Sequence, residues 1–231
     1  MNIVSLIDHA ILHPTAGETD LETGCRLAAE LGVASVCVKP YMVKQATEFL
    51  TDSPVAVGTV IGFPHGGNTT IVKSAEAEQA CIDGAVELDM VVNVGRVLAE
   101  DWEYVQADIA AVQVIAQSHH ALLKVIFETD YLTDSHIVEL CKLCSDLQVD
   151  FIKTSTGFGY TKRETGDYNY SGATIQHIQL MLDNVSGVVQ VKASGGIRTY
   201  QDAITLAEMG VTRLGTSASQ AIAEGGAGES Y

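Results

Sequence analysis

The sequence is poor in basic residues and has no long apolar run. Its 231 residues include 13 Lys and Arg against 29 Asp and Glu, a formal net charge of −16. A surface of that sign repels nucleic acid and anionic membranes. The apolar runs fall short of the roughly 20 residues that span a bilayer, and the first residues lack the basic segment of a signal peptide. We therefore expect a cytoplasmic protein without nucleic-acid or membrane partners.

Cysteine and proline are also scarce. Five cysteines, an odd number scattered along the chain, argue against a disulfide framework. Cys141 and Cys144 form a Cys-x-x-Cys pair, but no second Cys or His pair follows at zinc-ligand spacing, so we interpret them as core residues one helical turn apart. With 4 Pro, 47% hydrophobic and 18% charged residues, the chain is neither disordered nor fibrous.

Short apolar, β-branched runs alternate with helical patterns from end to end. Parallel strands covered on both faces have this composition. We predict strands at Leu6–His9, Ser35–Val38, Val55–Ile61, Val86–Val92, Leu122–Glu128, Phe151–Ser155, Val188–Lys192 and Arg213–Thr216. Between them, apolar residues recur at helical spacing, for example Trp102, Val105, Ile109, Val112 and Ala116.

Eight such units in one chain predict an α/β fold, a single-domain (β/α)8 TIM barrel over residues 1–231. Glycines near the end predict a flexible tail from about 225 to 231. A doubly wound open sheet is the alternative, but its usual Gly-x-Gly-x-x-Gly turn is absent. The polar segment Gly159–Ser171 is long for a loop of a barrel and is either a lid or an insertion.

Ionisable residues interrupt several of the predicted strands. Lysine is almost never fully buried without a reason, and the residues concerned are Asp8, Asp89, Lys124, Lys153 and Lys192. Neighbouring strands lie about 4.8 Å apart, so the amines of Lys153 and Lys192 approach closely if both point inward. Repulsion and burial both favour an uncharged amine. A neutral lysine beside another cation is a nucleophile toward aldehydes and ketones, which predicts imine formation.

Two glycine-containing loops follow the last two predicted strands. The first spans Ser194 to Thr199 and the second spans Leu214 to Ala218. Such loops present backbone N–H groups to anions, and this is the recurring phosphate site of TIM barrels. The sequence therefore predicts a phosphate site here, with Arg198 and the lysines adding positive charge.

Two histidine pairs offer a competing interpretation as a metal-dependent hydrolase. His9 and His13 lie four residues apart, and His119 and His120 are adjacent. The first pair straddles a strand end, and the second precedes a strand, at the opposite end of the barrel from an active site. We therefore expect no metal and no cofactor. A non-catalytic phosphosugar-binding protein is a third alternative.

The sequence resembles 2-deoxyribose-5-phosphate aldolase, a class I aldolase family, over nearly its whole length. The matching segments, in family order, are IDHAILHP, SVCVKPYMV, GTVIGFPHG, ELDMVVNVG, KVIFET, FIKTSTGF, VKASGGIRT and RLGTS. The resemblance implies reversible cleavage of 2-deoxy-D-ribose 5-phosphate to acetaldehyde and D-glyceraldehyde 3-phosphate, in deoxyribonucleoside catabolism. Its partners would be these small molecules, and a homodimer is one alternative for its assembly.

The resemblance also implies residue roles. Lys153 would form the Schiff base, Lys192 would lower the pKa of Lys153, and Asp89 would relay protons. Tyr231, at the end of the chain, would reach the site. Asp8, Lys124 and Cys37 would support it, and phosphate would bind at Gly157, Gly195, Gly196, Arg198 and Ser217.

This chain departs from some members of the family at two positions. Phe158 stands where they carry a phosphate-binding lysine, and Ala218 stands where they carry a second serine. Phosphate binding would therefore depend more on the glycine loops.

Overall fold

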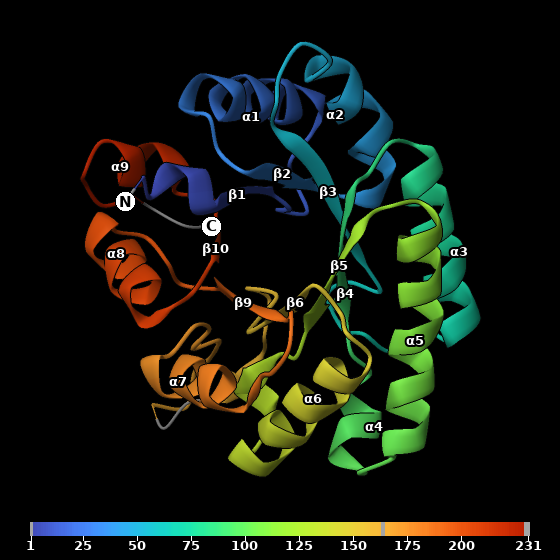
Figure 1. Ribbon diagram of the computed structural model, residues 1–231. Coiled ribbons are helices and arrows are strands. Elements are labelled where there is room, and N and C mark those ends of the chain that lie inside the picture. Colours follow the sequence, from blue (N-terminus) through green and yellow to red (C-terminus); the bar gives the residue numbers. More distant parts are fainter. Residues whose placement is uncertain (1, 163–164, 229–231) are drawn as a thin grey trace.

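A closed parallel barrel forms the centre of the computed structural model, which describes residues 2–162 and 165–228. Within those ranges eight strands close the barrel in the order β1-β10-β9-β6-β5-β4-β3-β2, and β2 pairs again with β1 (Figure 1). The barrel strands are β1 (Ile7–Ile11), β2 (Ser35–Val38), β3 (Ala56–Ile61), β4 (Glu87–Val91), β5 (Leu122–Ile126), β6 (Phe151–Lys153), β9 (Gln190–Ser194) and β10 (Arg213–Thr216). The predicted (β/α)8 fold is therefore confirmed, and the open sheet is excluded.

Helices surround the barrel as an outer ring (Figure 1). Their bounds are α1 (Glu18–Leu31), α2 (Val43–Phe49), α3 (Thr70–Ile82), α4 (Val94–Leu98), α5 (Trp102–Ser118), α6 (Asp134–Asp146), α7 (Ile175–Asn184), α8 (Tyr200–Met209) and α9 (Ser219–Ala223), with short 3₁₀ turns η1 (Val4–Leu6), η2 (Pro40–Met42) and η3 (Thr129–Tyr131). Helix α5 carries the predicted apolar stripe, and helix α6 buries Cys141 and Cys144 in the core.

Helix α8 has a capping residue at its start and a glycine at its end. The Thr199 side chain accepts a hydrogen bond from the Asp202 backbone N–H, and the Asp202 carboxylate accepts one from the Thr199 N–H. This reciprocal cap satisfies two backbone donors at the helix start. Gly210 follows the last turn with a φ of 113°, a conformation that glycine adopts without steric cost.

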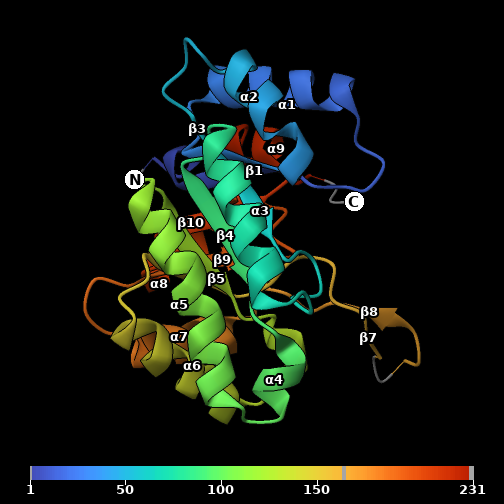
Figure 2. The same cartoon turned by 90° about the vertical axis from the view of Figure 1, so that its right-hand side faces the viewer.

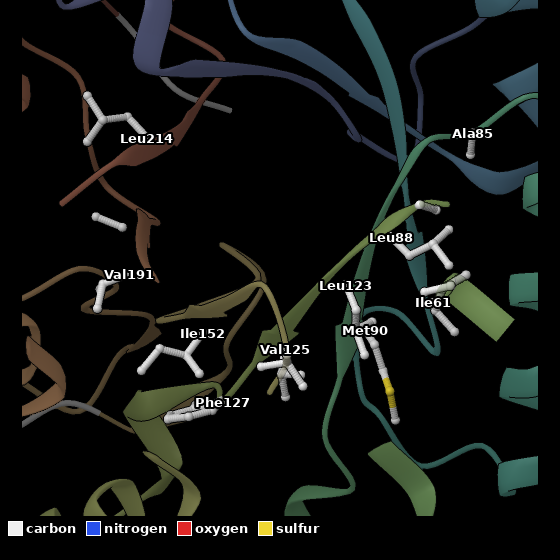
Figure 3. Close-up of a cluster of buried hydrophobic side chains, with 14 of the residues drawn as sticks. Ile61, Ala85, Leu88, Met90, Leu123, Val125, Phe127, Ile152, Val191 and Leu214 are labelled. Carbon is white, nitrogen blue, oxygen red and sulfur yellow. The ribbon is translucent and has the colours of Figure 1, made fainter. Parts of the chain in front are cut away.

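The strands alternate between two environments. Figure 3 shows apolar side chains of neighbouring strands, including Leu88, Met90, Leu123 and Val125, which belong to the main hydrophobic core. Residues one position away along a strand point to the opposite face. Those alternate positions in β4 and β5 carry Glu87, Asp89 and Lys124, all buried. The barrel therefore packs apolar side chains against its helices and encloses charged ones.

The segment after β6 is a hairpin that the sequence did not predict. Its strands β7 (Thr161–Lys162) and β8 (Tyr168–Asn169) pair antiparallel and project from one end of the barrel (Figure 2). The rings of Tyr160 and Tyr168 stack at a centroid distance of 4.5 Å. These two-residue strands are too short to show an alternation of apolar and polar residues, so a periodicity argument does not detect them.

Candidate active site

Strand register brings the charged residues of the barrel interior to neighbouring levels. Lys153 is paired with Lys192 between β6 and β9, and Lys192 is paired with Arg213 between β9 and β10. Between β4 and β5, Asp89 is paired with Lys124. Side chains that share a level and a face of a closed barrel converge on its axis, so these groups meet inside it.

The two lysines of the predicted pair share one carboxylate oxygen. Lys153 Nζ and Lys192 Nζ each lie 2.7 Å from Asp89 Oδ2. All three side chains are buried, with Lys153 3% exposed. Lys192 Nζ also donates a hydrogen bond to Asp8 Oδ2. The structure thus brings together the three residues that the sequence singled out for imine chemistry.

Asp8 and Lys124 extend this cluster toward two residues that the sequence reasoning missed. Lys124 Nζ lies 2.8 Å from Asp8 Oδ2 and 2.6 Å from Glu87 Oε2. Arg213 contacts Asp8 and donates from Nη2 to Glu87 Oε1 at 2.8 Å. A signal for Glu87 was available, because it lies two residues before Asp89 in one strand and so faces the same side.

Burial and nearby charges set the protonation of Lys153. Burial is the largest influence and lowers the pKa of its amine below the ordinary value. Asp89 opposes this by stabilising the ammonium form, whereas the charge of Lys192 lowers the pKa further. The lysine pair therefore acts in the predicted direction, but the loss of hydration contributes more than the repulsion between the two amines.

Two lysines and two aspartates of the cluster keep their charges. Burial disfavours the ammonium form of Lys192, but Asp8 and Asp89 outweigh it and raise its pKa. Lys124 behaves in the same way, with its pKa raised well above the ordinary value. Burial also disfavours the ionised carboxylates, yet the surrounding cations hold the pKa values of Asp8 and Asp89 below their usual range.

A cavity opens beside these amines. Lys153, Lys192, Asp8 and Cys37 line it, together with predicted phosphate-site residues Gly157, Gly195, Gly196 and Ser217. Gly195 and Gly196 have φ values of 89° and 79°, a left-handed backbone that favours glycine. A side chain at Gly195 would also approach the Cα of Gly172 at 3.0 Å. These glycines let the backbone turn closely around the cavity.

Among the other predicted site residues that the structure describes, Cys37 lines the cavity and Arg198 does not. Arg198 is exposed and is absent from the cavity lining, and its carbonyl accepts a hydrogen bond from the Gly228 N–H. Burial raises the pKa of the Cys37 thiol to about 11, so the thiol stays protonated near neutrality. Tyr231 lies outside the described residues, as do the other residues of the predicted tail after 228. Phe158 lines the cavity and packs edge-on against Phe63, with 5.5 Å between the ring centroids.

Glu128 and Thr156 form a second contact that sequence reasoning missed. The Glu128 carboxylate accepts hydrogen bonds from the backbone N–H and hydroxyl of Thr156, which lines the cavity. Burial raises the pKa of Glu128 to about 7. Asp130, two residues on, accepts hydrogen bonds from the N–H groups of Ser171 and Gly172. The two carboxylates therefore hold both ends of the segment that carries the hairpin.

Three of the four histidines in the competing interpretation contact other side chains. His9 Nδ1 lies 2.8 Å from Ser219 Oγ, and His13 Nδ1 lies 2.7 Å from Thr15 Oγ1. His119 pairs with Glu78 at 3.0 Å. Over residues 2–162 and 165–228, no group of three or more His, Cys, Asp or Glu side chains is arranged to hold a metal ion.

Comparison with known proteins identifies the family. The model of the DeoC/LacD family aldolases matches residues 3–218. The chain belongs to this aldolase family. It is therefore an enzyme of the carbon–carbon lyase class. In the described part of the chain, no helix has the length and apolar character to cross a membrane.

Individual members of the family align over most of their length. The deoxyribose-phosphate aldolase of Rhodopirellula baltica is 44% identical, covering 94% of this chain and 86% of its own. That of Clostridium perfringens strain 13 is 46% identical, covering 96% and 95%. The tetrameric deoxyribose phosphate aldolase of Aeropyrum pernix superposes with a TM-score of 0.85 at 30% identity, covering 96% of this chain and 89% of its own.

Proposed function

We propose that the protein is a class I aldolase that reversibly cleaves 2-deoxy-D-ribose 5-phosphate into acetaldehyde and D-glyceraldehyde 3-phosphate. The observation that carries the proposal is the buried amine of Lys153, which lines the cavity and has a lowered pKa. The substrate follows from relatives that carry the name deoxyribose-phosphate aldolase and align over nearly the whole chain.

In the proposed reaction the neutral amine of Lys153 attacks the aldehyde carbon of the open-chain sugar. The carbinolamine loses water and becomes a protonated imine, which accepts electrons. When a base removes the proton of the C3 hydroxyl, the C2–C3 bond breaks and glyceraldehyde phosphate leaves. The bonding electrons form an enamine, which is protonated at carbon. Water then hydrolyses the imine and releases acetaldehyde.

Proton transfers in this scheme are assigned to Asp89 and Lys192, acting with a water molecule and with Tyr231. Their contact with Lys153 through Asp89 Oδ2 supports the assignment. General acid–base catalysis of this type contributes about 10²–10⁴-fold to the rate. Asp8, Lys124 and Cys37 are proposed to support this proton relay without contributing chemistry of their own.

The phosphate group is proposed to bind the backbone at Gly157, Gly195, Gly196 and Ser217, which line one cavity with the lysines. Arg198 is retained as a contributor of positive charge near this site. Backbone N–H groups at these positions would let an acidic protein of net charge −16 admit a phosphorylated substrate.

We place the enzyme in the cytoplasm, in deoxyribonucleoside catabolism, working without a cofactor. A homodimer stays a prediction, and light scattering of the purified protein measures it.

Reductive trapping tests the mechanism. Incubation with acetaldehyde and borohydride should attach one ethyl group at Lys153, identified by peptide mass spectrometry. Lys153→Leu should form no adduct and show no turnover, whereas Lys142→Leu, which replaces an exposed lysine of α6, should behave like the wild type. An unmodified Lys153 would reject the imine mechanism. Phosphosugar binding without turnover would favour the non-catalytic alternative, and loss of activity on chelation would favour the metal-dependent one.

A further inference from the structure

We propose that Arg213 and Glu87 are positioning residues that determine how the buried carboxylates are shared among the lysines, and thereby the protonation state of Lys153. Neither residue lines the cavity, so both act through other side chains. The proposal rests on the proposed role of the Lys153 amine as the nucleophile.

The starting point is an unequal number of charges. In the described part of the chain, direct ion pairs join four cations and three carboxylates inside the barrel, namely Lys124, Lys153, Lys192, Arg213, Asp8, Glu87 and Asp89. With all seven ionised, the cluster would carry one uncompensated positive charge, which is costly in a buried site. Loss of one proton removes that charge. Because a guanidinium does not deprotonate in proteins, a lysine must lose it.

The contacts decide which lysine this is. Arg213 holds both oxygens of Glu87, at 2.8 and 3.1 Å, and contacts Asp8 as well. Lys124 Nζ lies within 3.1 Å of an oxygen of every carboxylate in the cluster. Lys192 bridges Asp8 and Asp89. In the described residues Lys153 pairs only with Asp89 Oδ2, an oxygen that it shares with Lys192.

Other groups around Lys153 do not replace this missing partner. The charged and titratable groups that act on it come from four elements, namely Asp89 of β4, Lys192 of β9, Cys37 of β2 and Glu128 after β5. The thiol of Cys37 and the carboxyl of Glu128 are both buried and hold their protons more strongly than usual. Lys153 is therefore the lysine with the smallest share of negative charge.

Removing Arg213 and removing Glu87 should change the negative charge available to Lys153 in opposite directions. Without the guanidinium, three lysines face three carboxylates, and Asp8 and Glu87 are free to neutralise Lys124 and Lys192. Asp89 then stabilises the ammonium of Lys153. Without the Glu87 charge, Lys124 depends more on Asp8 and Asp89, and Lys153 loses part of its share of the Asp89 charge.

The test compares Arg213→Gln, Glu87→Gln and the double variant, all as full-length chains. Competitive acetylation with a trace of acetic anhydride across a pH series reports the free amine of Lys153, with exposed Lys142 as the reference in the same sample. We expect the midpoint for Lys153 to rise in Arg213→Gln and fall in Glu87→Gln, each by on the order of one pH unit. The double variant restores one excess cation, so its midpoint should return toward the wild-type value.

Arg213→Lys is the matched control, because it places a cation opposite Asp8 and Glu87, and its midpoint should lie closer to the wild-type value than that of Arg213→Gln. Circular dichroism confirms that each variant is folded, and if Arg213→Gln is not folded, the downward shift in Glu87→Gln decides alone. Unchanged midpoints, or shifts of the two single variants in the same direction, would overturn the proposal. Acetylation needs no imine, so failure of acetaldehyde trapping at Lys153 would instead reject the proposed function.

Discussion

Two buried lysines of this protein carry lowered pKa values but have very different surroundings. Lys73 of α3 lies 2.6 Å from Asp108 of α5 and donates to the Val91 carbonyl at 2.9 Å. Thr70 donates a hydrogen bond to the same carboxylate. Burial lowers the pKa of Lys73 while Asp108 restores part of it. This is one cation matched to one carboxylate.

Lys153 differs from Lys73 in charge balance and in access. It shares its carboxylate with a second lysine and lines a cavity, whereas Lys73 is fully buried. The fully buried Lys73–Asp108 ion pair holds two helices together. The Lys153 amine, which shares its carboxylate and faces a cavity, is available for reaction. Burial of a lysine therefore indicates function only when its counter-charge is incomplete and a ligand can approach.

The largest expected effect is at Lys153, the lysine whose counter-charge is incomplete. Asp89→Asn removes the carboxylate shared by Lys153 and Lys192, and with it the proposed proton relay. We expect kcat for deoxyribose phosphate cleavage to fall about 10²–10⁴-fold. Steady-state kinetics measures this, and circular dichroism checks the fold. A folded variant with wild-type kcat would remove Asp89 from the mechanism.

Breaking the Lys73–Asp108 ion pair should instead lower the free energy of unfolding. Lys73→Met leaves the Asp108 carboxylate buried without its cation, which costs about 3–5 kcal/mol of unfolding free energy. Denaturant titration measures the loss, and kcat per folded molecule should stay at the wild-type value. The double variant Lys73→Met/Asp108→Leu should recover much of the stability. Lost turnover in folded Lys73→Met would contradict the assignment of a structural role to Lys73 and a functional role to Lys153.

A smaller effect concerns Glu128, a buried carboxyl without a cation at hydrogen-bond distance in the described residues. In the unfolded chain it titrates near 4.5, whereas the folded protein holds its proton up to about 7. Between these pH values the folded state binds more protons, so unfolding free energy falls as pH rises, by on the order of 3 kcal/mol in total. Denaturation curves at pH 5 and pH 7.5, conditions chosen to bracket the interval, measure the unfolding free energy. It should decrease less between the two pH values in Glu128→Gln than in the wild type. An identical decrease would contradict the shift.

The smallest expected effect is at the surface. Arg198 is exposed and outside the cavity lining, so its contribution to phosphate binding is limited to a screened attraction of a few tenths of a kcal/mol. Arg198→Ala should raise KM for deoxyribose phosphate about twofold and leave kcat unchanged. A tenfold rise would instead show that the guanidinium reaches the phosphate, as the sequence predicted.

Much of the architecture was predictable because of how parallel barrels are covered. Strands buried on both faces are apolar and β-branched, so β2 and β10 were predicted with the bounds that the structure has. The hairpin of β7 and β8 was not, since its short polar strands show no apolar face. Strand ends were misplaced by one or two residues elsewhere, as for β6, which ends at Lys153 and not at the predicted Ser155.

By itself, the sequence determined that charged residues interrupt apolar strands, because such residues stand out wherever hydrophobic burial is continuous. Lys153, Lys192 and Asp89 were found in that way. Only the tertiary structure decided which charge neutralises which. Arg213 reaches Asp8 across 205 positions of the chain. Electrostatic compensation depends on distances between atoms of different strands, and a linear sequence does not contain those distances.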